Sequence, residues 1–85
     1  LFGLKMGKGI IINCNALGIE WPYFPKRVIP WNEISHVILK DGVLTIEDNR
    51  NRVLQALLTA ESADSVSEDY FNRFCLTAMA SGQYA

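Results

Sequence analysis

The sequence predicts a small, mostly β domain that ends in one α-helix. Three observations support this fold class: apolar and polar residues alternate through much of residues 10–58, an Asp41-Gly42 dipeptide separates two such stretches, and the apolar period becomes helical after residue 65. The 85 residues suffice for one domain with one core. An apolar fraction of 49% is typical of a globular chain and too high for a disordered one.

The first predicted strands lie between residues 10 and 31. Residues 10–15 form a run rich in β-branched side chains, and a turn at 15–18 leads into a returning strand at 19–21. The segment that follows, WPYFPKRVIP, contains three prolines, which have no N–H to give to a ladder. We therefore expect loop there, followed by a short edge strand at 27–31.

The hairpin at 33–48 is the strongest local prediction. Asp-Gly favours a type I′ turn, because both central residues of that turn need a positive φ. Alternation on the two arms predicts that Leu39 pairs with Leu44, and Val37 with Ile46, on the buried face. The same register places His36 opposite Glu47 on the outside. A polar turn at 48–51 then leads into a last strand at 53–58.

A helix is predicted at about 66–81, after a polar linker at 59–65. Ser65 and Glu68 match the S-x-x-E capping box, and Ser67 is a rival N-cap. One apolar stripe follows at helical spacing, and Gly82 supplies a stop signal; the stripe consists of Phe71, Phe74, Cys75, Ala78 and Met79. Residues 83–85 are expected to be a tail. The predicted core comprises Trp31, Ile34, Val37, Leu39, Leu44, Ile46, Phe71 and Phe74.

The N-terminal residues allow two interpretations. Residues 1–8 open with the apolar LFGL and then carry Lys5 and Lys8, as at the cytoplasmic end of a transmembrane helix. We expect them to form a linker or the end of an upstream membrane segment, or else a short first strand. The main domain is then expected at 9–82, in a chain that is itself soluble.

Charge and cysteine content say little about partners. Residues 1–30 carry four basic residues and one acidic residue, whereas the remainder carries four basic and eight acidic. A basic N-terminal third suits an acidic partner or a membrane surface, but scattered solvated charge is the simpler explanation. Cys14 lies in a predicted strand and Cys75 on the apolar helix face, so we expect two buried free thiols and a reducing compartment.

The order of these elements resembles the pleckstrin-homology (PH) superfold. Residues 9–13 (GIIIN), Gly18-Ile19, residues 29–34 (IPWNEI) and Val37 are similar to a pattern of bacterial PH-like proteins. The resemblance covers roughly residues 8–58. It is closest to small uncharacterised bacterial membrane proteins in which a first strand and two transmembrane helices precede the rest of the domain. The resemblance implies a partial barrel of about six strands capped by a helix, on the cytoplasmic face of the inner membrane.

No catalytic or metal site is expected. The only histidine, His36, is predicted to lie outside while both cysteines lie in the core, and a zinc site generally needs three or four converging ligands. Glu47 and Asp48 are adjacent in a strand and point to opposite faces. We therefore expect no enzyme activity, no cofactor and no nucleic-acid partner.

The best candidate binding surface is the segment 21–27, which places aromatic side chains beside cations. The candidate residues are Trp21, Tyr23, Phe24, Lys26 and Arg27. Such a surface can contact a protein partner or anionic lipid headgroups. The simpler alternative is that the aromatics cap the barrel and the prolines stiffen a loop. A six-stranded domain would also leave a strand edge unpaired, so self-association is expected as well.

Overall fold

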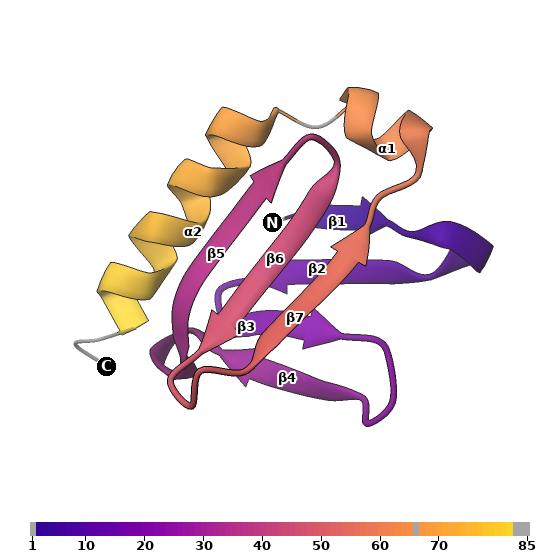
Figure 1. Ribbon diagram of the computed structural model, residues 1–85. Helices are drawn as coiled ribbons and strands as arrows, with labels where there is room; N and C mark the ends of the chain where they lie inside the picture. The colour runs from indigo at the N-terminus through magenta and orange to yellow at the C-terminus, as the bar shows by residue number, and fades with distance from the viewer. Residues whose placement is uncertain (1, 66, 83–85) are drawn as a thin grey trace.

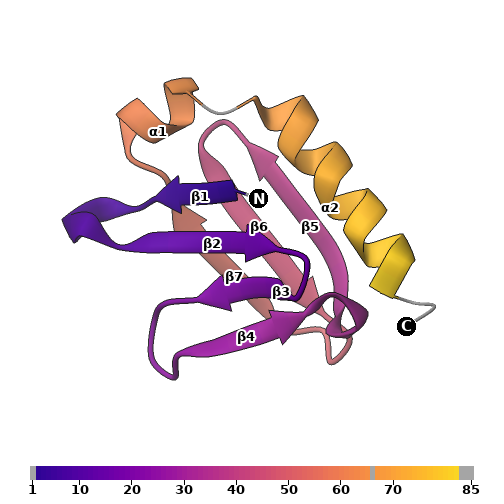
Figure 2. The ribbon, with the colours of Figure 1, turned by 180° about the vertical axis from the view of Figure 1, so that it is seen from behind.

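The computed structural model describes residues 2–65 and 67–82. Two antiparallel sheets lie face to face, with their strands crossing, and a long helix lies along one side (Figures 1 and 2). The first sheet has the order β1-β2-β3-β4, with strands at Phe2–Lys5, Ile11–Asn15, Gly18–Trp21 and Arg27–Pro30. The second has the order β5-β6-β7, with strands at Ile34–Lys40, Val43–Asp48 and Val53–Leu57.

The mostly β fold with a C-terminal helix is confirmed, but the strand count was wrong. The described residues form seven strands rather than six, because Phe2–Lys5 is a strand that pairs with β2 from Phe2↔Cys14 to Lys5↔Ile11. The sheet therefore begins well before residue 9, and of the interpretations left open for the N-terminal residues the short first strand is confirmed. Within the described part of the chain the two sheets form no closed barrel.

Two short 3-10 turns connect strands. Gly7–Gly9 (η1) joins β1 to β2, and Trp31–Glu33 (η2) carries the chain from the first sheet into the second. The Trp31 indole is buried, and its Nε1–H donates to the carbonyl oxygen of Asn15 at 2.7 Å. This bond ties the crossing between the sheets to the β2–β3 turn.

The predicted hairpin is confirmed in register and turn. Asp41 and Gly42 have φ values of 53° and 77°, as a type I′ turn requires. The pairs Leu39↔Leu44, Val37↔Ile46 and His36↔Glu47 all form. The four apolar side chains are buried, His36 is exposed and Glu47 is half-buried.

A β-bulge near the start of β5 lets Ile34 join the core. Ile34 pairs with Asp48 and His36 with Glu47, so Ser35 is an extra residue in the strand. Its hydroxyl lies 3.0 Å from the carbonyl oxygen of Glu47 and 3.1 Å from that of Asp48. Without the extra residue, Ile34 would face away from Val37.

Residues 60–65 are helical rather than a linker. Helix α1 spans Ala60–Ser65, and the Ser62 N–H donates to the Thr59 hydroxyl at 3.2 Å, as at an N-cap. The Thr59 N–H in turn donates to the Lys5 carbonyl at 3.0 Å, and the Lys5 N–H to the Ser62 hydroxyl at 3.2 Å. With a bridge between Met6 and Leu58, these bonds join the two sheets at one corner.

Helix α2 spans Glu68–Gly82 and lies along β5 (Figure 1). Its N-cap is Ser67, whose hydroxyl accepts the Tyr70 N–H at 3.2 Å. The side chain of Ser65, the other N-cap candidate, lies outside the described residues. The predicted tail at 83–85 lies outside them as well. Phe71 and Cys75 are fully buried. Phe74, predicted to be core, is only partly buried.

The core lies between the two sheets and under α2. It contains seven of the eight residues predicted for it, all except Phe74. The buried hydrophobic residues of the described ranges are Leu4, Met6, Ile12, Cys14, Ile19, Trp21, Ile29, Trp31, Ile34, Val37, Leu39, Leu44, Ile46, Ala56, Leu58, Phe71 and Cys75. Among the described residues, no helix combines the length and apolar character needed to cross a bilayer.

Candidate binding surface

The predicted binding segment divides into two packed aromatics and an exposed tip. Trp21 ends β3 with its side chain buried, and Tyr23 is half-buried against it. Their rings meet edge to face, with centroids 5.2 Å apart and planes at 63°. These two side chains therefore anchor the start of the β3–β4 loop, whereas Phe24, which the capping alternative paired with Tyr23, lies in solvent.

The tip of this loop presents an aromatic side chain beside two cations. Phe24 is 97% exposed, and its peptide bond to Pro25 is cis. Lys26 and Arg27 follow directly and are also exposed. Three of the five predicted residues are thus exposed, while Trp21 is buried and Tyr23 half-buried.

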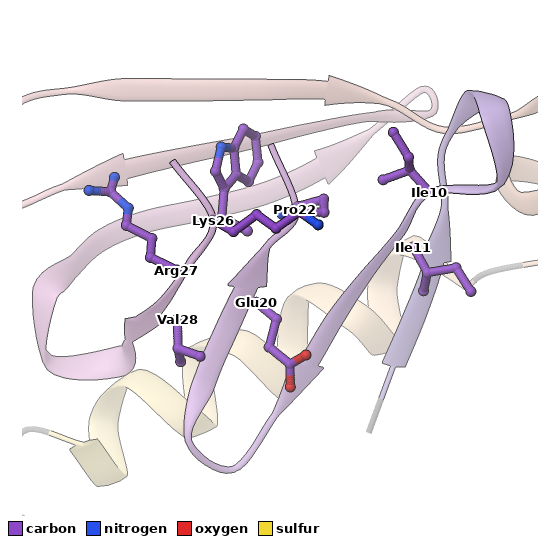
Figure 3. A pocket seen from close by; sticks show the side chains of 8 residues that line it. Ile10, Ile11, Glu20, Pro22, Lys26, Arg27 and Val28 are labelled. Carbon is purple, nitrogen blue, oxygen red and sulfur yellow. The ribbon is translucent and has the colours of Figure 1, made fainter. Parts of the chain in front are cut away.

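A hollow of about 590 Å³ opens beside this loop (Figure 3). Its lining includes residues that were not predicted as part of a binding surface. The lining residues are Ile10, Ile11, Glu20, Trp21, Pro22, Lys26, Arg27 and Val28. Ile10 and Ile11 enter from the β2 side, and Lys26 and Arg27 from the β4 side. Its size is within the range of pockets that bind small molecules or peptide side chains.

The hollow exists because β2 and β3 separate. Their ladder runs only from Asn15↔Gly18 to Asn13↔Glu20, although β2 stays paired with β1 as far as Ile11. The same register would place Pro22 opposite Ile11, and proline has no N–H with which to continue the ladder. Pro22 was the sequence signal for this opening, but it was interpreted only as a loop residue.

The charge around the hollow is mainly positive. The Glu20 carboxylate is held by the Asn15 side-chain amide at 2.8 Å and the Asn13 amide at 3.5 Å. Within residues 2–65 and 67–82 the ion pair found is Arg52–Asp48, at 2.8 Å, so Lys26 and Arg27 have no carboxylate partner there. The lining therefore combines apolar walls with two cations that form no ion pair and one carboxylate, so its net charge is positive.

A separate set of hydrogen bonds holds Asp48 in the turn after β6. Its carboxylate accepts the backbone N–H groups of Arg52 at 3.0 Å and Arg50 at 2.9 Å, and the Arg52 Nε–H at 2.8 Å. These bonds, led by that from the Arg52 backbone, lower the pKa of Asp48 below its usual value. We interpret this cluster as a turn-stabilising element.

Residues with potential reactivity do not converge in the described ranges. No group of three or more His, Cys, Asp or Glu side chains there could hold a metal ion. Cys14 and Cys75 are buried free thiols, as predicted, and burial raises the pKa of each to about 12. His36 lies on the exposed face of β5 opposite Glu47.

A smaller groove of about 180 Å³ lies between β5 and α2. It was not predicted, and it is lined by Ser35, His36, Val37, Ile38, Asn72, Leu76 and Met79. Leu76 and Ile38 are exposed there. The available signal was Leu76, a large apolar residue that falls outside the predicted stripe of α2.

Comparison with known proteins adds no assignment. No protein-family model and no curated protein matches this chain.

Proposed function

We propose that this protein is a non-catalytic PH-like interaction module that binds a protein partner through the β3–β4 loop and the adjoining hollow. The order of the elements supports the PH-like part of the proposal: a four-stranded antiparallel sheet, a three-stranded one and then a helix. The family resemblance further supports a cytosolic domain of a bacterial membrane protein. An uncut gene that encodes two upstream apolar spans of about 20 residues would test that context.

The observation that carries the proposal is the exposure of Phe24. A fully solvated phenylalanine forgoes the free energy of burial, about 1.5–3 kcal/mol, which a bound partner would recover. The loop that presents it is anchored by Trp21 and Tyr23, so little ordering is required on binding. Aromatic and arginine side chains are also the residues most enriched at the energetic centres of protein interfaces.

Selection from a random peptide display library tests this proposal. We expect peptides enriched on the wild-type protein to lose about tenfold or more in affinity for the double variant Phe24→Ser/Arg27→Glu. The matched control is Lys40→Glu/Leu76→Ser, which removes one exposed cation and one exposed apolar side chain on β5 and α2. Peptides that bind both double variants as well as wild type would contradict the proposal.

A second candidate function is binding to anionic lipid, and the same tip favours it. An exposed aromatic beside Lys26 and Arg27 can enter the interfacial region of a bilayer while the cations contact anionic headgroups. Co-sedimentation with phosphatidylcholine vesicles, with and without phosphatidylserine, separates the two functions. Lipid binding predicts sedimentation only with phosphatidylserine, weakened both by salt and by Phe24→Ser.

A further inference from the structure

The gap between β2 and β3 leaves part of a strand edge available at Ile11. In an antiparallel strand the backbone groups of successive residues point alternately to the two neighbouring strands. The Met6 N–H donates to the Ile10 carbonyl at 2.8 Å, so Ile10 faces the β1 side. The N–H and C=O of Ile11 therefore face the opposite way, toward the hollow, where the ladder with β3 has ended.

The two faces of this gap differ in character. Ile10 and Arg27 point to one side of the sheet, and Ile11, Glu20 and Val28 to the other (Figure 3). On the first side Ile10 packs against the core and Trp21 is buried. On the other side Lys5 is exposed and lies directly opposite Ile11 in the register of β1 and β2. Lys26 enters the hollow from the loop.

Cations also surround the hollow beyond its own lining. A neighbouring hollow of about 320 Å³ shares Ile11, and its charged lining residues are Lys5, Lys8 and Glu61. Within the described ranges Lys5, Lys8, Lys26 and Arg27 all lack an ion-pair partner, and the nearby Glu20 is held by two asparagines. Charge complementarity therefore favours an acidic occupant.

We infer that the gap between β2 and β3 binds a short, extended, acidic segment of a partner protein, which continues the ladder of β2 at Ile11. Alternate side chains of that segment contact Ile10 and Trp21 on one side of the sheet and direct carboxylates toward Lys5 on the other, and a further carboxylate reaches Lys26, which enters the hollow from the loop. A polypeptide fits better than a headgroup, because Ile11 offers both a donor and an acceptor and a strand satisfies both. The inference rests on the proposed function and names the chemistry of the partner.

Titration with designed peptides tests this inference. The probe is an acetylated, amidated heptapeptide of alternating leucine and aspartate, compared with its leucine–lysine counterpart, and binding is followed by the amide resonance of Ile11. We expect only the acidic peptide to bind. N-methylation at alternate positions should weaken it about threefold to tenfold, the worth of one backbone hydrogen bond, while the intervening positions tolerate it.

A charge swap in the protein provides the second arm. Lys26→Glu should weaken binding of the leucine–aspartate peptide and strengthen binding of the leucine–lysine peptide, whereas the control Lys40→Glu should change neither. Equal binding of both peptides, or tolerance of N-methylation at every position, overturns the inference. Library peptides that still depend on Phe24 would leave the proposed function standing in that case. Failure of both the library and the designed peptides would overturn both proposals.

Discussion

Gly18 occupies a position where the structure leaves no room for a side chain. It has a φ of 149°, and a Cβ built there would lie 2.1 Å from the carbonyl oxygen of Ile29 on β4. The turn before it is fixed by the Asn15 side chain, which accepts the Leu17 N–H at 2.9 Å. Because the contact is with backbone, no side-chain movement can relieve it.

We therefore expect Gly18→Ala to destabilise the fold by about 3 kcal/mol or more, since backbone strain and overlap with a strand act together. Gly7→Ala is the matched control, because a Cβ at Gly7 would meet nothing within 4 Å. Its stability should stay within about 0.5 kcal/mol of wild type. Urea unfolding followed by tryptophan fluorescence measures both. Equal midpoints for the two variants would contradict the close approach of β4.

At the level of elements, helix side chains bind backbone groups at one position on the edge of β5 and at one position on the edge of β1. The Asn72 side-chain amide pairs with the backbone of Leu39 on β5, accepting its N–H at 2.8 Å and donating to its C=O at 3.0 Å. At Lys5 on β1 the Ser62 hydroxyl accepts the backbone N–H, and the Thr59 backbone N–H donates to the carbonyl oxygen. Polar helix residues thus satisfy backbone groups that would otherwise pair with another chain.

Asn72→Ala should cost about 1–3 kcal/mol, because it leaves the part-buried N–H and C=O of Leu39 without partners. The exchange of the Leu39 amide with deuterium should accelerate with it. Arg73→Ala, an exposed change on the same helix, serves as the control and should leave the Leu39 amide protected. Unchanged protection in Asn72→Ala would show that another group shields the β5 edge.

Local signals in the sequence predicted some elements and missed others. The hairpin of β5 and β6 was predictable because turn residues and alternation agree over a short stretch. The bulge at Ser35 was not, since a one-residue insertion leaves no pattern of its own. Strand β1 remained one of two alternatives, because its apolar residues also suit the end of a membrane segment. The hollow depends on the absence of a residue pair between β2 and β3 beyond Asn13↔Glu20, which only the three-dimensional structure reveals.

At the scale of the whole molecule, α2 connects the second sheet to the crossing between sheets. The helix packs on β5 and on η2. Phe71 is fully buried, whereas Phe74 meets Trp31 edge to face, with ring centroids 6.0 Å apart and planes at 77°. The helical stripe predicted both residues as core, but a helix lying along a sheet buries only the centre of its apolar face.

Substitutions in α2 should reflect this difference. Phe71→Ala should cost about 3–5 kcal/mol, a large share of the stability of a domain this small. Phe74→Ala should cost less, about 1–3 kcal/mol, because part of its ring is already solvated and the loss includes one aromatic contact. Thermal unfolding measures both, and a larger effect at Phe74 would contradict the placement of the helix.

Because both thiols are buried and protonated, the folded protein does not react with reagents that require a thiolate. Cys14 comes from the first sheet and Cys75 from α2, and each has a pKa of about 12 compared with 9.0 for an unperturbed thiol. Below pH 9.0 both thiols are protonated in the folded and the unfolded protein, so the raised pKa values lower the stability of the fold only as the pH rises from there toward 12. At neutral pH, alkylation of either cysteine therefore requires a transient opening of the core that separates the first sheet from α2. The rate of labelling therefore measures how often the core opens, and the native cysteines serve as the probe.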